Sequence, residues 1–266
     1  MLSINPLGAS IGAEITGVDL RAPLSSEAAS AIHRAFLDHI VVVIRGESLT
    51  PQQYRDALAQ FGEPMRQHRE KYNLPDCPDV SFVTNIGGFG RAEHWHTDHT
   101  NHECPPKVTA LHAVKLPSRG GATWFANMYA GFDALSPQSR ERIEHLHTLN
   151  SMEDNPGYSQ VDRERNCGGV RHPMVRTHPE TGRKALYFHL TKSQQIEGVD
   201  DEKVRPLLEK LLTEAVRPEF VYKHVWQAGD VVLADNRCAM HRVEHDYPEG
   251  EHRELWRVIL QGDRPV

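Results

Sequence analysis

The chain has 266 residues, of which 39% are hydrophobic and 25% are charged, and its formal net charge at pH 7 is −6. This balance is typical of a globular chain that forms one large domain, and it disfavours a general binder of nucleic acid or of acidic membranes. The sequence has no apolar run of about 18 residues, so we expect no transmembrane helix, and its start lacks the basic and apolar regions of a signal peptide.

The first part of the chain predicts short strands and a helix. Residues 7–20 indicate short strands separated by glycine turns, and residues 25–38 indicate a helix. The run IVVVI at residues 40–44 is continuously apolar and mostly β-branched. Such a run is typical of a strand that is buried on both faces.

A second helix is predicted to begin at Pro51. Thr50 precedes it as the N-cap, Pro51 takes the first helical position, and Gln53 completes a capping box. Residues 63–93, which follow this helix, are rich in proline, glycine and charge. They are predicted to form a long loop region, and loops of that length often serve as lids or binding loops.

From Trp95 onward the sequence predicts short strands and two further helices. Residues 136–147 indicate a helix, apolar residues recur at helical spacing over 204–215, and residues 150–170 indicate a second loop-rich span. This pattern favours a β-sandwich or barrel with flanking helices. Strands are expected around His96 and over residues 108–114, 122–126, 186–189, 221–226, 230–233 and 255–260.

The pair His96 and Asp98 is the first candidate for a metal site. On an extended strand, residues two apart point to the same face, so this imidazole and this carboxylate would lie together. A second imidazole, from His241, could complete a set of three ligands on one side of a metal ion. Two histidines and one carboxylate with open positions suit Fe(II) that is used for oxygen activation.

The His-x-Asp pair alone is weak evidence, because the chain holds 17 histidines and 36 acidic residues. Such a pair is also compatible with a solvated polar strand edge. His94 shares the expected strand face of His96, and His99 and His102 are further candidate ligands. We rank these three lower, because the sequence around His96 and His241 is more informative than the ligands alone.

Several ordered motifs, spread over almost the whole chain, resemble the taurine and 2,4-dichlorophenoxyacetate dioxygenase family (the TauD/TfdA family). They are WHTD at residues 95–98, LPSRGGAT at 116–123, GDVVLADNRC at 229–238 with the following His241, and RELWR at 253–257. GAEITGVDL at 12–20 and VRTHPETGRKALYF at 175–188 resemble the family as well. The resemblance implies a mainly β double-stranded β-helix (a cupin-like jelly roll) with flanking helices, as a single domain over residues 1–266.

The resemblance further implies an enzyme that uses Fe(II), 2-oxoglutarate and O2. His96, Asp98 and His241 match the iron ligands of the family, which are its catalytic residues. Thr123, after the double glycine, matches the residue that contacts 2-oxoglutarate. Arg253 matches the arginine that pairs with the distal carboxylate of this cosubstrate, and the planar guanidinium fork suits that partner.

Two further residues match positions that contact the prime substrate in relatives. Arg257 matches an arginine that meets the anionic group of the substrate, and His68 lies in the loop that holds a substrate-contacting histidine, although the register differs slightly. On a strand, Arg253 and Arg257 would share one face, about 13 Å apart, and so could serve two different anions. A surface ion pair with Glu251 or Glu254 is the alternative for either arginine.

Other parts of the expected pocket depart from the family. Residues 99–102 (HTNH) stand where relatives often have an aromatic residue, so His99 and Asn101 could line a more polar pocket. Tyr72 is a further candidate. Three aromatic residues are expected to be core or strand-pair side chains: Trp95, Trp124 and Trp226.

These inferences predict a 2-oxoglutarate-dependent non-haem iron dioxygenase that hydroxylates a C–H bond of a small anionic substrate. The substrate would be a carboxylate, sulfonate, sulfate or phosphonate, and succinate and CO2 would be released. No nucleic acid and no membrane is expected as a partner, and the resemblance alone suggests a homo-oligomer. The four scattered cysteines, without a C-x-x-C pair, are expected to be reduced thiols in a cytoplasmic protein.

Three other functions stay open at this point. One keeps the same cofactors but performs a desaturation or another oxidation within a biosynthetic pathway. The others are a non-catalytic jelly-roll protein with a structural metal and a zinc hydrolase, and the pairing of Thr123 with Arg253 weighs against both. The carboxylate of Asp98 argues against a halogenase, because such relatives have a small residue at this position.

Overall fold

The computed structural model describes residues 2–46, 48–67, 70–86, 92–152 and 168–266. In these ranges the largest sheet has nine strands in the order β1-β2-β3-β15-β7-β17-β6-β5, with β4 pairing with β17 beside this path. All of its strand pairs are antiparallel except β2 with β3. Its strands are β1 (Ser3–Pro6), β2 (Ala13–Thr16), β3 (Val41–Ile44), β4 (Pro64–Met65), β5 (Asn73–Leu74), β6 (Cys77–Thr84), β7 (Val108–Lys115), β15 (Val231–Asp235) and β17 (Glu254–Leu260).

A smaller sheet in the order β14-β8-β16 packs against the large one through a shared core. It is formed by β14 (Val221–His224), β8 (Thr123–Asn127) and β16 (Ala239–Val243). The other described strands form a sheet in the order β10-β9-β13 and a two-stranded pair of β11 with β12. These strands are β9 (His147–Asn150), β10 (Val170–Pro173), β11 (Val175–Thr177), β12 (Lys184–Leu186) and β13 (Ser193–Ile196).

Alternation of side chains along β3 shows how the large sheet separates two cores. Val41 and Val43 belong to the core between the two sheets, together with Phe125 of β8. Val42 and Ile44 point to the opposite face and belong to the second core, which α1 (Ser26–His39) and α2 (Pro51–Ala59) cover. These four side chains are at most 1% exposed, which confirms the prediction of a strand buried on both faces.

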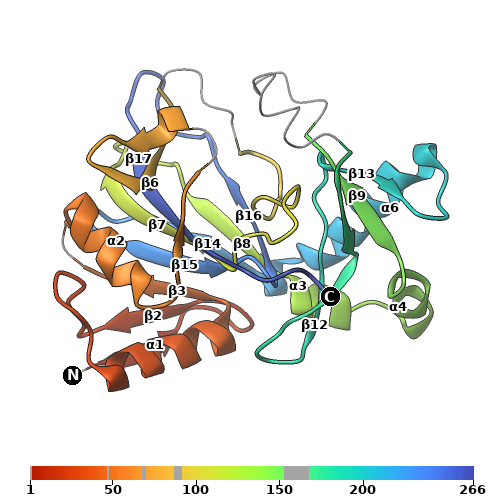
Figure 1. Cartoon of the computed structure of the whole chain (residues 1–266), viewed down its shortest axis with the longest axis horizontal. Helices are drawn as coiled ribbons and strands as arrows, with labels where there is room; N and C mark the ends of the chain where they lie inside the picture. Colours follow the sequence, from red (N-terminus) through yellow and green to blue (C-terminus); the bar gives the residue numbers. More distant parts are fainter. Residues whose placement is uncertain (1, 47, 68–69, 87–91, 153–167) are drawn as a thin grey trace.

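The helices lie outside the two sheets (Figure 1). α1 and α2 cover the large sheet at one end of the molecule, and α3 (Met128–Asp133), α4 (Pro137–Ile143) and α6 (Asp201–Ala215) gather at the other end. The predicted helix starts are confirmed, because Ser25 caps α1 and the side chains of Thr50 and Gln53 form the capping box of α2. Across the described ranges, each helix is too short or too polar to span a bilayer.

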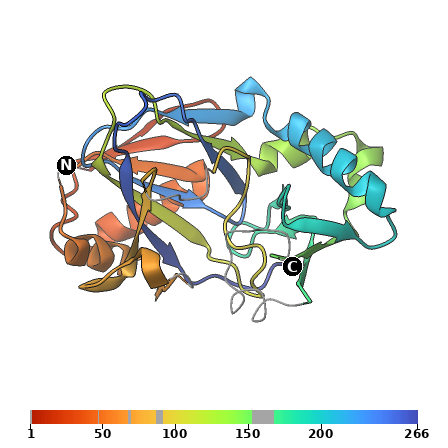
Figure 2. The same cartoon turned by 90° about the horizontal axis from the view of Figure 1, so that it is seen from above.

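The amphipathic helix predicted over residues 204–215 is α6. Its apolar stripe is buried, and it packs against α3, beside which it runs in Figure 2. Gly131 allows this close approach, since a Cβ atom built on it would lie 2.6 Å from Cβ of Ala215. The buried residues of the stripe are Val204, Leu208, Leu211, Leu212 and Ala215.

Some predictions about local structure were wrong, and the first concerns residues 63–93. The span 63–93 was predicted to be a loop region, but it contains β4, β5, a 3-10 turn over Glu70–Tyr72 and the eight-residue strand β6. β6 forms because it pairs with β17, in register from Ser81 opposite Arg257 to Thr84 opposite Glu254. Such pairing between distant segments leaves little signal in a stretch rich in proline and charge.

Over residues 7–20 the structure has one strand, β2, where several short strands were predicted. Two more errors concern element ends. The helix predicted over 136–147 ends at Ile143, and β9 already begins at His147. The strand predicted over 186–189 ends at Leu186, and the chain turns in the following residues. The loop-rich span 150–170 is described only at its two ends, where β9 ends and β10 begins.

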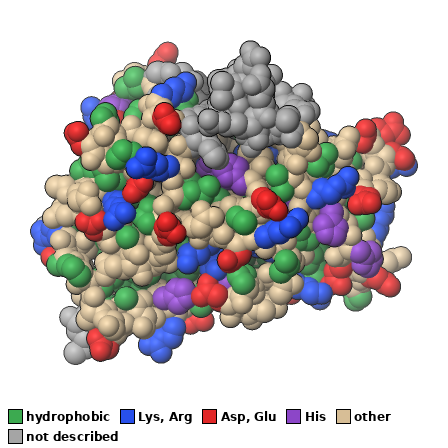
Figure 3. Space-filling view, in the orientation of Figure 1, with side chains coloured by type: hydrophobic (Ala, Val, Ile, Leu, Met, Phe, Trp, Pro, Cys, Tyr) green, Lys and Arg blue, Asp and Glu red, His purple; other side chains and the backbone are tan. Residues whose placement is uncertain are grey.

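The arrangement of two facing sheets with helices outside them is the double-stranded β-helix that the sequence predicted. Three of the candidate site residues lie on these sheets: Thr123 on β8, His241 on β16 and Arg257 on β17. On the face shown in Figure 3, the described Lys and Arg side chains are interspersed with Asp and Glu. The three cysteines within the described ranges, Cys77, Cys104 and Cys238, are free, and Cys167 lies outside these ranges.

Candidate active site

His96 and His241 are held side by side by a short antiparallel contact. The predicted strand around His96 is reduced to an isolated bridge with His241, in which each backbone N–H donates to the other residue's carbonyl, at 3.0 and 2.8 Å. His241 lies at the centre of β16, so the small sheet fixes its position. The two imidazole ring centroids are 4.3 Å apart. A single bridge is therefore sufficient to bring the two rings together.

Asp98 completes a cluster of three potential ligand atoms. One ligand atom from each of His96, Asp98 and His241 lies within 4.8 Å of the other two. Oδ1 of Asp98 is 3.9 Å from Nε2 of His96, so these side chains converge as predicted, although Asp98 lies in a turn and not on the expected strand. His94 is exposed, and neither it nor His99 nor His102 joins this cluster in the described structure.

The protonation states of the cluster suit a divalent metal. Nδ1 of His96 donates to the carbonyl of His94 at 2.8 Å, which leaves Nε2 with a free lone pair. Burial lowers the pKa of His96 and lowers the pKa of His241 to about 3. Burial would raise the pKa of Asp98, but the combined electrostatic effect of Arg257 and of the nearby His241, His99 and His96 holds this pKa well below its usual range. Two neutral imidazoles and one carboxylate therefore face each other at neutral pH.

The double glycine is required by the local backbone. Gly121 has a positive φ of 72°, and a Cβ atom on it would lie 3.0 Å from the side chain of Arg253. Gly120 also has a positive φ, and its Cβ would collide with Asp246. Glycine at both positions lets the chain turn and lets Arg253 pass close to the backbone. The Nε–H of Arg253 donates to the carbonyl of Gly121 at 3.0 Å.

Thr123 and Arg253 form a polar pair beside the metal cluster. The hydroxyl oxygen of Thr123 accepts from Nε1 of Trp226 at 3.0 Å and faces a guanidinium nitrogen of Arg253 at 3.4 Å. Because two donors surround this oxygen, the hydroxyl hydrogen is available to an additional acceptor. The sequence predicted that Trp226 is a core or strand-pair side chain, and the structure adds a polar contact that the sequence did not suggest.

Arg253 is a buried cation without a carboxylate partner in the described structure. Arg253 is only 4% exposed. Burial lowers the pKa of its guanidinium to about 10, so the guanidinium stays charged at neutral pH. The alternative of an ion pair with Glu251 or Glu254 is wrong, because Glu251 binds Ser118 and Glu254 faces His252. A buried cation of this kind requires an anionic partner, and a bound carboxylate would supply one.

Arg257 lies between the metal cluster and a buried amide. Its guanidinium is 3.8 Å from Oδ2 of Asp98, and the amide of Gln67, when oriented with its oxygen toward the guanidinium, accepts from Nε of Arg257 at 2.9 Å. Among the described residues, Glu251 binds Ser118 and Glu254 faces His252, so a surface ion pair with either of them is wrong for Arg257 as well. Gln67 precedes His68, which lies outside the described residues. The sequence did not single out Gln67, because a lone glutamine carries no pattern.

The turn after β12 adds polar side chains that the sequence did not predict. The ring centroid of His189 lies 5.8 Å from that of His96, and its Nδ1 accepts from the backbone N–H of Thr191 and of Lys192. Nζ of Lys192 donates to Oδ1 of Asn101 at 2.8 Å. Burial first, and then nearby charges that include Lys192, lower the pKa values of His96 and of His189.

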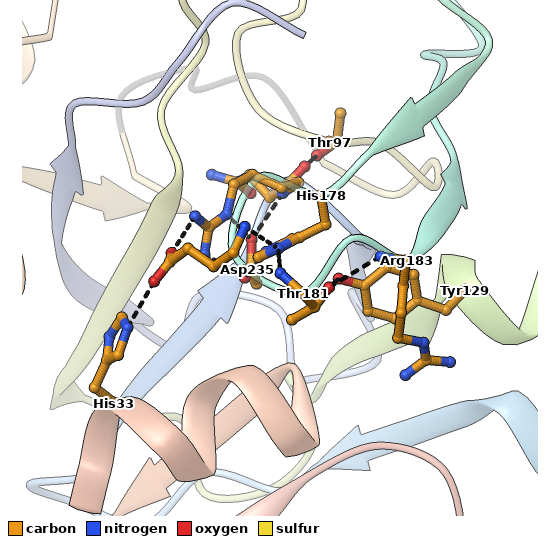
Figure 4. A network of polar contacts seen from close by, with 10 residues as sticks. His33, Thr97, Tyr129, His178, Thr181, Arg183 and Asp235 are labelled. Carbon is orange, nitrogen blue, oxygen red and sulfur yellow. Dashed lines mark hydrogen bonds and ion pairs between the residues drawn. The ribbon is translucent and has the colours of Figure 1, made fainter. Parts of the chain in front are cut away.

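The structure brings together a second group of residue types that can bind metal, namely His178, Asp235 and Cys238. His178 and Asp235 belong to a buried network of ion pairs and hydrogen bonds, which Figure 4 shows. Nε2 of His178 donates to Asp235 at 3.0 Å and its Nδ1 accepts two backbone N–H groups, so both ring nitrogens are used. Asp235 accepts two hydrogen bonds of 2.8 Å from Arg237. Burial raises the pKa of the Cys238 thiol well above its usual value. These contacts leave no free ligand set.

Replacing Asp235 by asparagine is expected to lower the free energy of unfolding by about 3 kcal/mol, because Arg237 would lose its buried counter-charge. Urea unfolding at neutral pH measures this change.

The pair of Asp235 with Arg237 also makes the stability of the fold depend on pH. The pKa of Asp235 is lowered from 3.8 to about 2, through Arg237 and His178 against the opposing effect of burial. The stabilisation is therefore complete above about pH 4 and is lost as the pH falls through the folded pKa.

The exposed pair of Arg205 with Glu209, 2.6 Å apart on α6, provides the matched control. Glu209→Gln is expected to change the free energy of unfolding by about 0–1 kcal/mol. If Asp235→Asn changes it no more than this control, the network does not stabilise the fold as we describe.

The chain is similar to known proteins over nearly its whole length. The sequence model of the family described as "Taurine catabolism dioxygenase TauD, TfdA family" matches residues 3–259. The chain is 32% identical to an alpha-ketoglutarate-dependent 2,4-dichlorophenoxyacetate dioxygenase of Cupriavidus pinatubonensis, and the match covers 98% of each chain. It is 31% identical to an alkylsulfatase of Acinetobacter baylyi, over 98% of this chain and 86% of the relative.

Solved structures show the same relationship. A taurine dioxygenase from Burkholderia xenovorans superposes with a TM-score of 0.87 at 33% identity, covering 100% of this chain and 91% of that one. A structure of AAD-2 in complex with Mn(II) and N-oxalylglycine gives a TM-score of 0.86 at 29% identity, covering 100% and 99% of the two chains. The chain therefore belongs to the taurine catabolism dioxygenase TauD, TfdA family.

Proposed function

We propose that this chain hydroxylates a C–H bond of a small anionic substrate, with Fe(II) bound by His96, Asp98 and His241 and with 2-oxoglutarate bound by Thr123 and Arg253. The reaction class follows from the family: the chain is a 2-oxoglutarate-dependent dioxygenase that uses Fe(II) and O2. The observation that supports our assignment most directly is Arg253, a buried guanidinium without a carboxylate partner in the described structure, beside the Thr123 hydroxyl.

Each group in the site has a defined task in this proposal. When bound, iron and 2-oxoglutarate activate O2, so that one oxygen atom enters the product and the other enters succinate as CO2 leaves. Arg253 and Thr123 bind the far carboxylate of 2-oxoglutarate by charge and by hydrogen bonding, which orients its keto acid end toward the three ligands. His96 and His241 remain neutral and Asp98 remains ionised, so no proton has to leave before the metal binds.

The class of substrate is inferred from the charge beside the metal cluster. Arg257 faces the cluster, and Lys192 lies close enough to lower the pKa of His96 and of His99 beyond the effect of burial. Two cations on the substrate side favour an anion such as a carboxylate, sulfonate, sulfate or phosphonate. Relatives of this chain act on 2,4-dichlorophenoxyacetate and on sulfate esters, which are anions of this kind.

Anaerobic titration of the Fe(II)-loaded protein with 2-oxoglutarate tests the metal and cosubstrate assignment. We expect a weak visible absorption band when the keto acid end chelates the iron. Arg205→Ala serves as the control substitution, since it removes an exposed arginine of α6 and should leave the band in place, as in the unaltered protein. If no band forms with either protein, the metal or the cosubstrate is bound elsewhere.

The substrate class is tested by measuring succinate release with a panel of carboxylates, sulfonates, sulfate esters and phosphonates. A substrate should stimulate succinate release in the presence of O2 and gain one oxygen atom, which mass spectrometry detects. A product that loses two hydrogens instead would indicate desaturation. If neutral analogues stimulate the reaction as strongly as anions, or if Arg257→Gln leaves their discrimination unchanged, the anionic class is wrong.

A further inference from the structure

A chain of buried hydrogen bonds leads from the turn before β16 to the carboxylate of Asp98. Nδ2 of Asn236 lies 2.8 Å from the hydroxyl oxygen of Thr109, and this hydroxyl lies 2.6 Å from Oδ2 of Asp98. Asn236 and Thr109 are each 2% exposed. Water therefore has little access to replace either contact. The hydrogen bond to Oδ2 of Asp98 has to come from the protein.

The direction of these hydrogen bonds follows from the groups themselves. An ionised carboxylate can only accept, so the hydroxyl of Thr109 must donate its hydrogen to Asp98. The remaining lone pairs of this hydroxyl then accept from the amide nitrogen of Asn236, which matches the observed contact. A charge-assisted hydrogen bond to a buried carboxylate is stronger than one between neutral groups.

Asn236 also holds the backbone around the two ligands of the His-x-Asp motif. Its carbonyl accepts from the hydroxyl of Thr97 at 3.0 Å, and its own N–H donates to the carbonyl of Lys107 at 3.0 Å. Thr97 stands between His96 and Asp98, and Asn236 precedes the strand that positions His241. One buried residue thus connects the segments that hold all three ligands.

We propose that Thr109, supported by Asn236, is a positioning residue that fixes the Asp98 carboxylate so that only Oδ1 is presented to the metal. This inference rests on the proposed function, because it takes Asp98 to be a ligand of Fe(II). Oδ2 is occupied by Thr109 and faces Arg257 at 3.8 Å, while Oδ1 points to His96. Ligation through one oxygen would leave room at the metal for 2-oxoglutarate and O2.

The test is the metal affinity of Thr109→Val, which removes the hydroxyl at nearly constant volume. Binding of Mn(II), followed by the loss of the free-ion electron paramagnetic resonance signal, is expected to weaken about 10- to 100-fold. The visible band of the Fe(II) and 2-oxoglutarate complex should also shift, because the carboxylate is free to turn. Thr109→Ser keeps the hydroxyl and should restore most of the affinity and the position of the band.

Thr148→Val is the matched control. Thr148 is also a fully buried threonine with hydrogen bonds, to Asn150 and to the carbonyl of His172, but it lies in the sheet of β9, β10 and β13. This variant should bind Mn(II) as the unaltered protein does, even if its metal-free thermal unfolding shifts. Should Thr109→Val fail to fold, Thr109→Ala provides the same measurement.

Two outcomes separate this inference from the proposed function. If Asp98→Ala retains the full Mn(II) affinity, the assignment of the metal ligands itself is wrong. If Asp98→Ala loses affinity but Thr109→Val binds Mn(II) normally and leaves the band unshifted, only the positioning role of Thr109 is wrong.

Discussion

Replacing Asp98 by alanine is expected to reduce O2-dependent succinate formation by about 10³-fold, and to weaken Fe(II) binding in parallel. The variant removes the only anionic member of the three-residue cluster, so the two neutral imidazoles remain to hold a dication. A metal ion contributes several kcal/mol to the catalysed step, and each 1.4 kcal/mol corresponds to about a tenfold change in rate. The measurement combines metal titration with succinate release at saturating 2-oxoglutarate.

Asp56 on α2 supplies the control for the loss of an aspartate. It is an exposed residue that contacts Gln52 and Arg55, and Asp56→Ala should leave metal affinity and turnover unchanged. If Asp98→Ala binds Fe(II) tightly and turns over at a rate near that of the unaltered protein, the cluster is not the Fe(II) site.

Replacing Arg253 by alanine is expected to raise the KM for 2-oxoglutarate by about 10²-fold while the metal-binding residues stay in place. A charge-assisted hydrogen bond in a buried site contributes about 1.5–3 kcal/mol, and Arg253 is the buried cation that Gly121 and Thr123 hold in place. Steady-state kinetics with varied 2-oxoglutarate measures the change. Arg253→Lys should recover only part of it, because an ammonium group lacks the planar fork that matches a carboxylate.

The pKa of Arg253 adds a check that does not require a variant. Burial lowers this pKa to about 10, which is still well above neutrality. The affinity for 2-oxoglutarate should therefore be constant between about pH 7 and pH 9 and should decline as the pH approaches the pKa of Arg253. Arg205→Ala, at an exposed position on α6, is the control substitution and should not change the KM. An unchanged KM in Arg253→Ala would show that 2-oxoglutarate is anchored by another residue.

The sequence by itself determined the elements whose signals are local. The helix that begins near Ser25, the cap at Thr50, the apolar run of β3 and the apolar stripe of α6 depend on neighbouring residues, and the structure has each of them as predicted. The convergence of His96 with Asp98 also followed from a spacing of two residues. His241 was different, since only its place in an ordered set of motifs indicated that a residue so distant in the chain belonged beside them.

Only the tertiary structure decided the contacts that join distant segments. β6 exists because β17 supplies its hydrogen-bonding partner, and His96 needs a single bridge to β16 where the sequence suggested a strand. Asn236 and Thr109 are ordinary polar residues in sequence, and their role emerges only when folding places them 2.8 Å apart in the core. Local patterns predict where a helix starts or a strand is buried. The partner of a buried polar group, in contrast, depends on chain segments that meet only in the folded state.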